Sequence, residues 1–398
     1  MSLDSTAKIK AAVNKVAGKV IEIRKTIHQN PELSFQEEET AALAAAEMEK
    51  LGFKVEENVF ATGVVATFIN SNSESDKTLL IRADMDALPI QEKNDLSYKS
   101  QKSGVMHACG HDGHTAILIG TAMVLKELAA EFSGKIKFVF QPGEETSGGA
   151  EGMIKTGVLE SPKVDAALGL HLWGSTPYGV VEYKAGPFMA APDRFDLTII
   201  GRGGHAARPH NTIDPIPIGA EIISALQTIV SRKVDPLESA VISVCKFSAG
   251  STHNVIPDQA EIKATVRSLK EDLRQQLAAD IESVIKNICN IYDADYKLDY
   301  IFGYPAVKND AVITDLLASS AAKILGPARV QKRTKAEMGG EDFSYFGLEV
   351  PSVFYFLGIA PAGKVINHHQ ADFKFANDIL KDGVAVMAQT AIDFFAAD

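Results

Sequence analysis

The sequence predicts an α/β protein: a mixed, mostly parallel sheet with helices on both faces, interrupted by an inserted ferredoxin-like α+β lid domain. Three observations support this prediction. Strand and helix patterns alternate in the N-terminal part of the chain and resume in its C-terminal part, whereas the middle part has a different order of elements. The chain has 398 residues, which exceeds the size of about 250–300 residues at which a single core stops growing. We therefore expect residues 1–188 and 304–398 to form one catalytic domain, with a lid or dimerisation domain at 189–303 between them.

The first segment alternates helical and strand patterns. Helices are expected at about 5–27 and 37–51, the second ending before Gly52. Apolar runs predict strands at 78–85 (TLLIRADM) and 166–173 (AALGLHLW), and alternating polar and apolar residues predict a strand at 135–141 (KIKFVFQ). An apolar helix is expected after residue 114. Strands separated by helices favour parallel pairing. The polar stretch NSNSESDK (70–77) is expected to be a surface loop.

The middle segment follows the order β-α-β-β-α-β, which is the split-βαβ or ferredoxin-like unit. Its expected strands are FDLTIIG, SAVISVCKFS, QAEIKATVRSL and YKLDYIF, and its two helices begin near residues 215 and 270. Afterwards a helix at 310–326, the strand SVFYFLG and a helix from 377 return to the first domain. Hinges are expected near 187–192 and 302–306.

Composition excludes several classes of partner. The net charge of −11, without a run of Lys and Arg, argues against nucleic acid. No stretch reaches the roughly 18 apolar residues of a membrane span. Three cysteines without a C-x-x-C pair argue against a disulfide framework and favour a reducing compartment, and the N-terminal pattern lacks the apolar core of a secretory signal. We expect a cytoplasmic enzyme.

The stretch MHACGHDGHT (106–115) concentrates groups that carry chemistry. Cys109 and His111 lie in a Gly-containing turn just before a helix, where a thiolate and an imidazole can face one point. Taken alone, this pair fits a metal site and a structural polar corner equally well. A nucleophilic thiol is a weaker interpretation.

Further metal-binding side chains follow two predicted strands. Glu144 and Glu145 come directly after a strand, where open α/β sheets place their ligand crevice. Adjacent residues of an extended chain point in opposite directions, so one carboxylate can face a metal while the other reaches a bound water; the alternative is two solvated acids. His171 ends a buried strand, and His368 and His369 lie in the returning segment.

These side chains supply a thiolate, a carboxylate and three or more imidazoles, a donor set that suits Zn²⁺, Mn²⁺, Co²⁺ or Ni²⁺. One tetrahedral catalytic ion needs only three protein ligands and a water. Two ions sharing a water fit the number of donors better.

The chain resembles the M20 metallopeptidase superfamily, specifically its amidohydrolase branch of N-acyl-amino-acid amidohydrolases, hippurate hydrolases, indoleacetyl-amino-acid hydrolases and related carboxypeptidases. The resemblance runs almost end to end and implies a binuclear metallo-exopeptidase fold. It rests on the motifs IHQNPELSF, RADMDALPI, HACGHDGHT, QPGEE, GLH, GRGGHAARPH, NVIPD, TVRS, MGGEDFSYF and HHQADF.

The resemblance implies a role for each matching residue. It makes Glu144 the general base, and it gives the metal ligands as Cys109, His111, Glu145, His171 and His369. Asp84 stands where other branches carry a ligand histidine, and Asp86 is expected to orient a ligand. Ala371 replaces a proline that is usual in the last motif, so His368 remains an alternative to His369.

The inserted domain is expected to contact substrate. The resemblance favours His205, in a Gly-rich turn, as a donor to the developing oxyanion, in some relatives from a partner subunit; an exposed turn histidine is the alternative. Arg267, together with Asn254, is expected to bind a free carboxylate.

The predicted function is metal-dependent hydrolysis of the amide bond of N-acyl-L-amino acids, with two divalent ions (Zn, Mn, Co or Ni) and a Glu general base. The alternative is a metallocarboxypeptidase or dipeptidase acting on short peptides. A catalytically dead relative is disfavoured, because it has no need of Glu144 beside Glu145. A homodimer or homotetramer through the lid domain is a further expectation.

Overall fold

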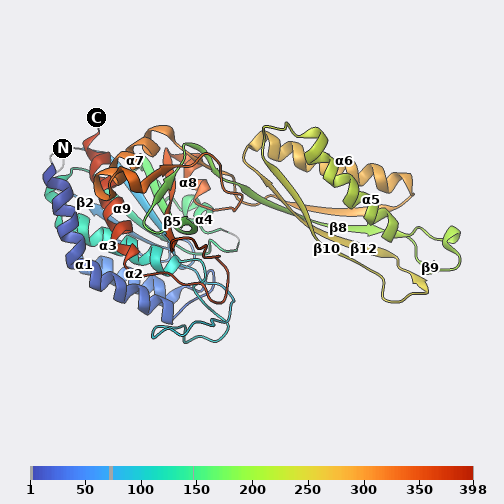
Figure 1. Ribbon diagram of the computed structural model, residues 1–398, viewed down its shortest axis with the longest axis horizontal. Coiled ribbons are helices and arrows are strands. Elements are labelled where there is room, and N and C mark those ends of the chain that lie inside the picture. Colours follow the sequence, from blue (N-terminus) through green and yellow to red (C-terminus); the bar gives the residue numbers. More distant parts are fainter. Residues whose placement is uncertain (1–2, 71–74, 147, 398) are drawn as a thin grey trace. The chain divides into compact units, whose positions relative to one another are not determined.

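The computed structural model describes residues 3–70, 75–146 and 148–397. The chain forms two compact units (Figure 1). Unit 1 comprises Met1–Phe188, Lys308–Lys335 and Asp342–Asp398, and unit 2 comprises Met189–Val307 and Ala336–Glu341. Of the surface loop predicted at 70–77, residues 71–74 lie outside the described residues. Within the described ranges, no helix has the length and apolarity needed to cross a membrane.

Unit 1 is built on an eight-stranded sheet of order β1-β2-β4-β3-β5-β16-β6-β15. Its central strands β4, β3, β5 and β16 are mutually parallel. The bounds are β1 (Lys54–Glu56), β2 (Val64–Ile69), β3 (Thr78–Asp84), β4 (Lys135–Gln141), β5 (Ala166–Pro177), β6 (Val181–Tyr183), β15 (Val330–Lys332) and β16 (Ser352–Ala360). Every residue of β3 and β16 is buried, as expected for central parallel strands. The predicted mixed, mostly parallel sheet is confirmed.

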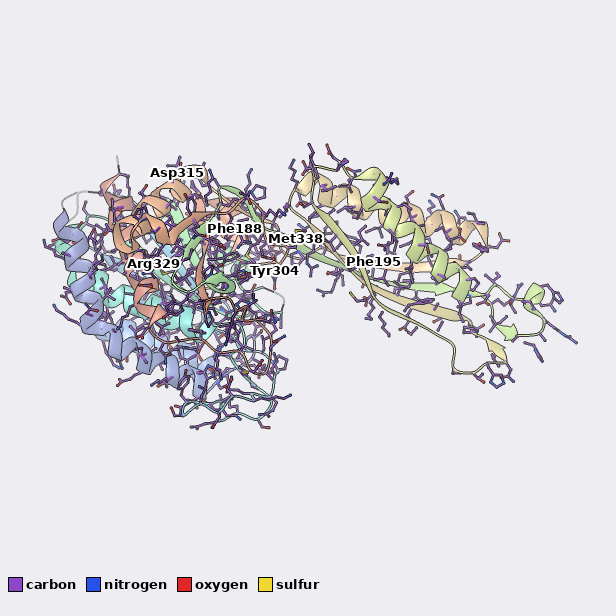
Figure 2. The ribbon with its side chains drawn as sticks, viewed as in Figure 1. Phe188, Phe195, Tyr304, Asp315, Arg329 and Met338 are labelled. Atoms are coloured by element: carbon purple, nitrogen blue, oxygen red, sulfur yellow. The ribbon has the colours of Figure 1, made fainter. Side chains whose placement is uncertain are left out.

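Helices α1, α3, α7 and α9 of unit 1 pack against one another, and α4 contacts α8. The bounds are α1 (Leu3–Gln29), α2 (Glu38–Lys50), α3 (His111–Glu127), α4 (Ala150–Lys155), α7 (Ala311–Leu325), α8 (Ser344–Glu349) and α9 (Ile379–Ala396). Helix α3 is buried on nearly every side, because its sequence is apolar all round. The rings of the buried residues Phe188 and Phe356 are tilted at 42° to each other, with centroids 4.5 Å apart. Figure 2 labels Phe188.

Unit 2 has the predicted order β-α-β-β-α-β. Its antiparallel sheet runs β10-β12-β8-β13, the strand order of a ferredoxin-like fold. The bounds are β8 (Ala191–Ile200), α5 (Pro215–Thr228), β10 (Ala240–Ala249), β12 (Gln259–Ser268), α6 (Glu271–Ile291) and β13 (Asp295–Ile301), with a short pair β9 (Gly204–His205) and β11 (Val255–Ile256). Helix α6 buries Leu277, Ile281 and Ile285, spaced by one helical turn, against this sheet.

The division of the chain differs in detail from the predicted segments. Residues 336–341 belong to unit 2, although the sequence assigns them to the catalytic domain. Hydrogen bonding explains the difference, because the Ala190 N–H donates to the Gly339 carbonyl at 2.9 Å and Met189 forms a bridge with Glu337. Strands β7 (Gly186–Met189) and β14 (Val307–Asn309), which contain two of the points where the chain passes from one unit to the other, form a two-stranded sheet.

Candidate metal centre

The predicted metal ligands of unit 1 lie beyond the carboxyl ends of its parallel strands. Strands β3 and β4 end at Asp84 and Gln141, and β5 carries His171 past the end of its pairing with β3. Cys109 precedes α3 and His111 is its first residue, with Gly110 between them at φ 103°. A left-handed turn there favours glycine, and it turns both side chains towards the sheet edge.

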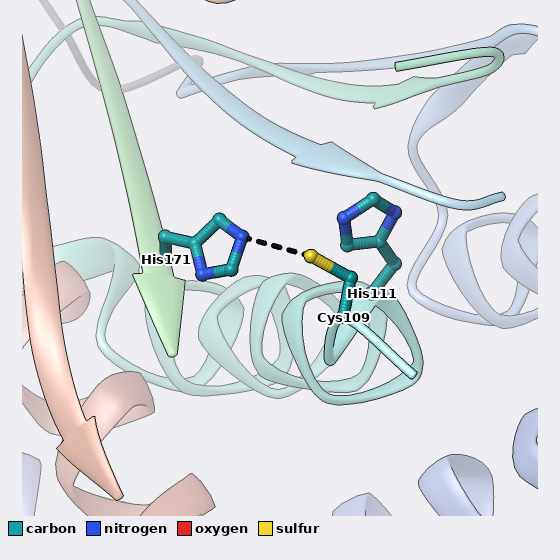
Figure 3. Close-up of side chains that lie close together, drawn as sticks. All are labelled: Cys109, His111 and His171. Carbon is teal, nitrogen blue, oxygen red and sulfur yellow. Dashed lines mark hydrogen bonds between the residues drawn. The ribbon is translucent and has the colours of Figure 1, made fainter. Parts of the chain in front are cut away.

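Six predicted residues gather into one cluster. The ligand atoms of Cys109, His111 and His171 lie within 4.8 Å of one another, and the same limit holds for Cys109–Glu145–His369 and for His111–Glu144–Glu145. The His171 Nε2 atom is 3.4 Å from the Cys109 Sγ atom (Figure 3). Because these sets share members, the structure brings together the complete set of predicted ligands and the predicted base.

Two buried atoms of the cluster lack a hydrogen-bond partner among the described residues. They are His111 Nε2 and Glu145 Oε1, which lie 3.8 Å apart. Leaving a buried polar atom unsatisfied is costly, and native proteins rarely do so without a reason. The other ring nitrogen of His111 donates to Asp86 Oδ1 at 3.1 Å, the arrangement that usually orients a metal-binding histidine. These atoms therefore fit a divalent cation.

Electrostatics at the cluster also fit a bound cation. Burial raises the pKa of the Cys109 thiol well above its usual value, and Glu145 and Glu144 raise it further. Burial alone would lower the pKa of His111, but Asp84 and Asp86 outweigh burial and raise this pKa to about 10. The surplus negative charge around the thiol would be neutralised by a divalent cation, which also deprotonates a coordinating thiol.

The two C-terminal histidines have different surroundings. His369 has 52% of its side chain exposed and places Nε2 3.3 Å from Glu145 Oε1. Its φ of 60° is left-handed, and its N–H donates to the Ala108 carbonyl at 2.8 Å, which ties it to the Cys109 turn. His368 instead donates from Nε2 to the Leu172 carbonyl at 2.9 Å. This geometry favours His369 over His368 as the ligand.

Sequence reasoning singled out Asp84 but missed its buried partners His114 and Arg82 and the nearby Asp342. Asp84 accepts from His114 Nδ1 and from Arg82, each at 2.6 Å. Asp342 accepts from Arg82 at 2.7 Å and also from Gln141. The spacing of His114, three residues after His111 on one helix, was the available signal, because such residues share a helix face.

The predicted oxyanion donor His205 and the predicted substrate-binding residues Asn254 and Arg267 all belong to unit 2. His205 is exposed, and its Nδ1 accepts from the Ala207 N–H at 3.1 Å. Asn254 lies beside it, because the Ala206 N–H donates to the Asn254 carbonyl at 3.2 Å. Arg267 is half-buried and donates to the Asp193 carbonyl at 3.2 Å.

Strand register separates Arg267 from Asn254. Arg267 pairs with Pro192 and Gln259 with Ile200, so they lie at opposite ends of β12. Eight residues of strand span about 26 Å, and Asn254 lies beyond the Gln259 end. Asn254 and Arg267 of one chain therefore lie too far apart to bind one carboxylate together, because this distance far exceeds the size of a carboxylate.

Comparison with known proteins assigns the family. A model of peptidase family M20/M25/M40 matches residues 80–393. The N-acyl-L-amino acid amidohydrolase of Geobacillus stearothermophilus is 46% identical over 302 residues, covering 76% of this chain and 80% of its own length. Thermostable carboxypeptidase 2 of Saccharolobus solfataricus is 39% identical over 397 residues, covering 98% and 99%.

A solved structure agrees with this assignment. The Bacillus subtilis YxeP protein, described as a dinuclear metal-binding peptidase of family M20, is 33% identical with a TM-score of 0.83, covering 97% of this chain and 100% of its own. The fold, the clustered metal-binding side chains and these matches lead to one conclusion: the chain belongs to peptidase family M20/M25/M40 and is a hydrolase.

Proposed function

We propose that this enzyme hydrolyses the amide bond of N-acyl-L-amino acids with two divalent metal ions. The observation that carries the proposal is the convergence of Cys109, His111, Glu145, His171 and His369 around Glu144. The amidohydrolase from Geobacillus supports the substrate class. A metallocarboxypeptidase acting on short peptides is the second candidate, favoured by the similarity to the Saccharolobus carboxypeptidase.

The donor set supports particular ions. A thiolate with several imidazoles and a carboxylate suits Zn²⁺, Mn²⁺, Co²⁺ or Ni²⁺. When bound, two such ions supply positive charge that polarises a carbonyl and acidifies water. Cys109, His111, Glu145, His171 and His369 would hold them.

Glu144 would act as the general base. It is 8% exposed, and its carboxylate is within 4.8 Å of the ligand atoms of His111 and Glu145. It would accept a proton from the attacking water and deliver it to the leaving nitrogen, a role that contributes roughly 10²–10⁴-fold to rate. Burial of Glu144 at the cluster supports this assignment over a solvated acid.

Unit 2 would supply the remaining contacts. Arg267 would bind the free carboxylate of the substrate, because a guanidinium pairs well with that group. His205 would donate to the oxygen that becomes negative during attack. Because His205 and Asn254 lie about 26 Å along the sheet from Arg267, we propose that they act on the site of a second copy of the chain in a homodimer or larger homo-oligomer. A cytoplasmic location stays a prediction.

Activity of the reloaded apoenzyme tests the proposed function. The apoenzyme is reloaded separately with Zn²⁺, Mn²⁺, Co²⁺ or Ni²⁺ and assayed on N-acetyl and N-benzoyl amino acids beside dipeptides with the same C-terminal residue. Preference for acyl-amino acids supports the first candidate, and preference for dipeptides supports the second. Full activity of the metal-free protein would contradict both.

A further inference from the structure

Leu172 has polar contacts that its sheet does not explain. The pairing of β3 with β5 ends at Arg82 and Gly169, three residues earlier, whereas β16 continues beside Leu172 through Leu357. On the side that β3 has left, none of the described strands pairs with Leu172. Its buried N–H and C=O nevertheless need hydrogen bonds.

Histidine side chains form the hydrogen bonds to Leu172 that a neighbouring strand would otherwise form. The Leu172 N–H donates to His114 Nε2 at 2.9 Å. The Leu172 carbonyl accepts from His171 Nδ1 and from His368 Nε2, both at 2.9 Å. Three histidines, from α3, β5 and the C-terminal segment, thus meet at one residue.

These bonds determine which ring nitrogen carries the proton. A backbone N–H only donates, so His114 Nε2 must offer its lone pair, and its proton sits on Nδ1, which donates to Asp84 at 2.6 Å. A carbonyl only accepts, so His171 is protonated at Nδ1. Its Nε2 lone pair therefore faces Cys109 Sγ, 3.4 Å away.

We infer that His114 and His368 are positioning residues, which bind Leu172 in place of a strand and thereby fix His171 and His369 at the metal centre. This inference rests on the proposed function. The ligand atoms of Asp84, His111 and His114 lie within 4.8 Å of one another, which is close enough for an ion. His114 cannot be a metal ligand, however, while its two ring nitrogens are hydrogen-bonded to Asp84 and Leu172. His368 holds the segment that delivers His369, the next residue.

Paired substitutions test the role of His114. In H114Q the amide oxygen reaches the former Nε2 position and still accepts from Leu172, whereas in H114N the shorter side chain serves only Asp84. We expect H114N to weaken metal binding by about 10–100-fold, typical for loss of such an orienting partner. H114Q should bind metal more tightly than H114N.

The readouts are Co²⁺ and Zn²⁺ affinities of the apoprotein, measured by chelator competition, and the thiolate-to-cobalt absorption that Cys109 would give. We expect H114N to alter this absorption, and H368N to weaken binding more than H368Q, because the glutamine amide still donates to Leu172. H210N is the control, because His210 is exposed and lies in unit 2, away from Leu172 in the chain. It should bind metal like the parent.

The outcomes separate the two proposals. A parent protein that binds no Co²⁺ or Zn²⁺ would overturn the proposed function and this inference with it. A parent that binds metal, with H114N equal to it in affinity and spectrum, would overturn only the inference. Equal losses of metal affinity in H114N and H114Q would also overturn only the inference, because they would indicate general packing damage rather than loss of the acceptor for the Leu172 N–H.

Discussion

Glu144 and Glu145 are neighbours in the chain but have different expected roles at the metal centre. Glu145 Oε1 faces His111 and His369, at 3.8 and 3.3 Å from their Nε2 atoms. The Glu145 N–H also donates to Asp86 at 2.9 Å, and the same Asp86 binds His111. Asp86 therefore fixes the backbone of one predicted ligand and the ring of another.

Replacing each glutamate by glutamine should separate base from ligand. Glu144→Gln should retain both metal ions but lose turnover by roughly 10²–10⁴-fold, because only the proton acceptor is removed. Glu145→Gln should lose metal as well as activity. Metal content by mass spectrometry and kcat on one N-acyl amino acid measure the difference. An E144Q enzyme with the turnover of the parent would disprove the base assignment.

Arg267 should discriminate between substrates by their carboxylate. Arg267→Ala should lower kcat/KM for N-acyl amino acids by about 10–100-fold, the value of a charge-assisted hydrogen bond, and should change hydrolysis of the corresponding amides or esters much less. Arg267→Lys keeps the charge but lacks the planar guanidinium. Its kcat/KM for N-acyl amino acids should lie between the values of the parent and of Arg267→Ala. Equal losses on both substrate classes would exclude the role.

At the scale of elements, a buried ionic network joins α1 to α3. Arg24 and His28 of α1 both bind Asp112 Oδ2 of α3, at 3.0 and 2.9 Å, and His28 also contacts Glu92 at 3.3 Å. Burial lowers the pKa of His28, but its hydrogen bonds to Asp112 and Glu92 outweigh burial and raise this pKa from 6.5 to about 9. The network therefore ties α1 to α3, the helix that begins with the predicted ligand His111.

The stability supplied by His28 should depend on pH. Because its pKa is higher in the folded state, this contribution should be complete below pH 6.5 and should be lost as pH rises through about 9. Urea unfolding of the metal-free parent and His28→Gln should therefore differ by about 2–3 kcal/mol more at pH 6 than at pH 10. His210→Gln, at an exposed position, is the control. A difference independent of pH would contradict the charged state of His28.

At the scale of the whole molecule, the ends of the unit 2 sheet carry different predicted functions. Arg267 pairs with Pro192, close to where the chain enters unit 2 at Met189. His205 pairs with Val255 in the short β9–β11 ribbon, beyond the other end of β12. This separation is the physical reason for proposing that a site combines residues of two copies.

Mixed oligomers should reveal such sharing. Coexpressed E144Q and H205A chains should recover about one quarter of parental activity, because half of randomly paired dimers contain one intact site of two. Mixing E144Q with E145Q should give no such recovery, since both residues belong to unit 1. If coexpressed E144Q and H205A chains were no more active than each variant alone, His205 would belong to the site of its own chain.

The sequence by itself was sufficient for the fold class and for naming the side chains that gather at the candidate metal centre. Apolar runs and helical periodicity are local, so they predicted the parallel sheet, whereas the full set of donors was implied by the motifs that the chain shares with the M20 family. Only the tertiary structure decided the separation of Asn254 from Arg267, the engagement of His368 with Leu172 and the tautomer of His114. These features depend on register and hydrogen bonds between residues far apart in the chain, which local patterns do not encode.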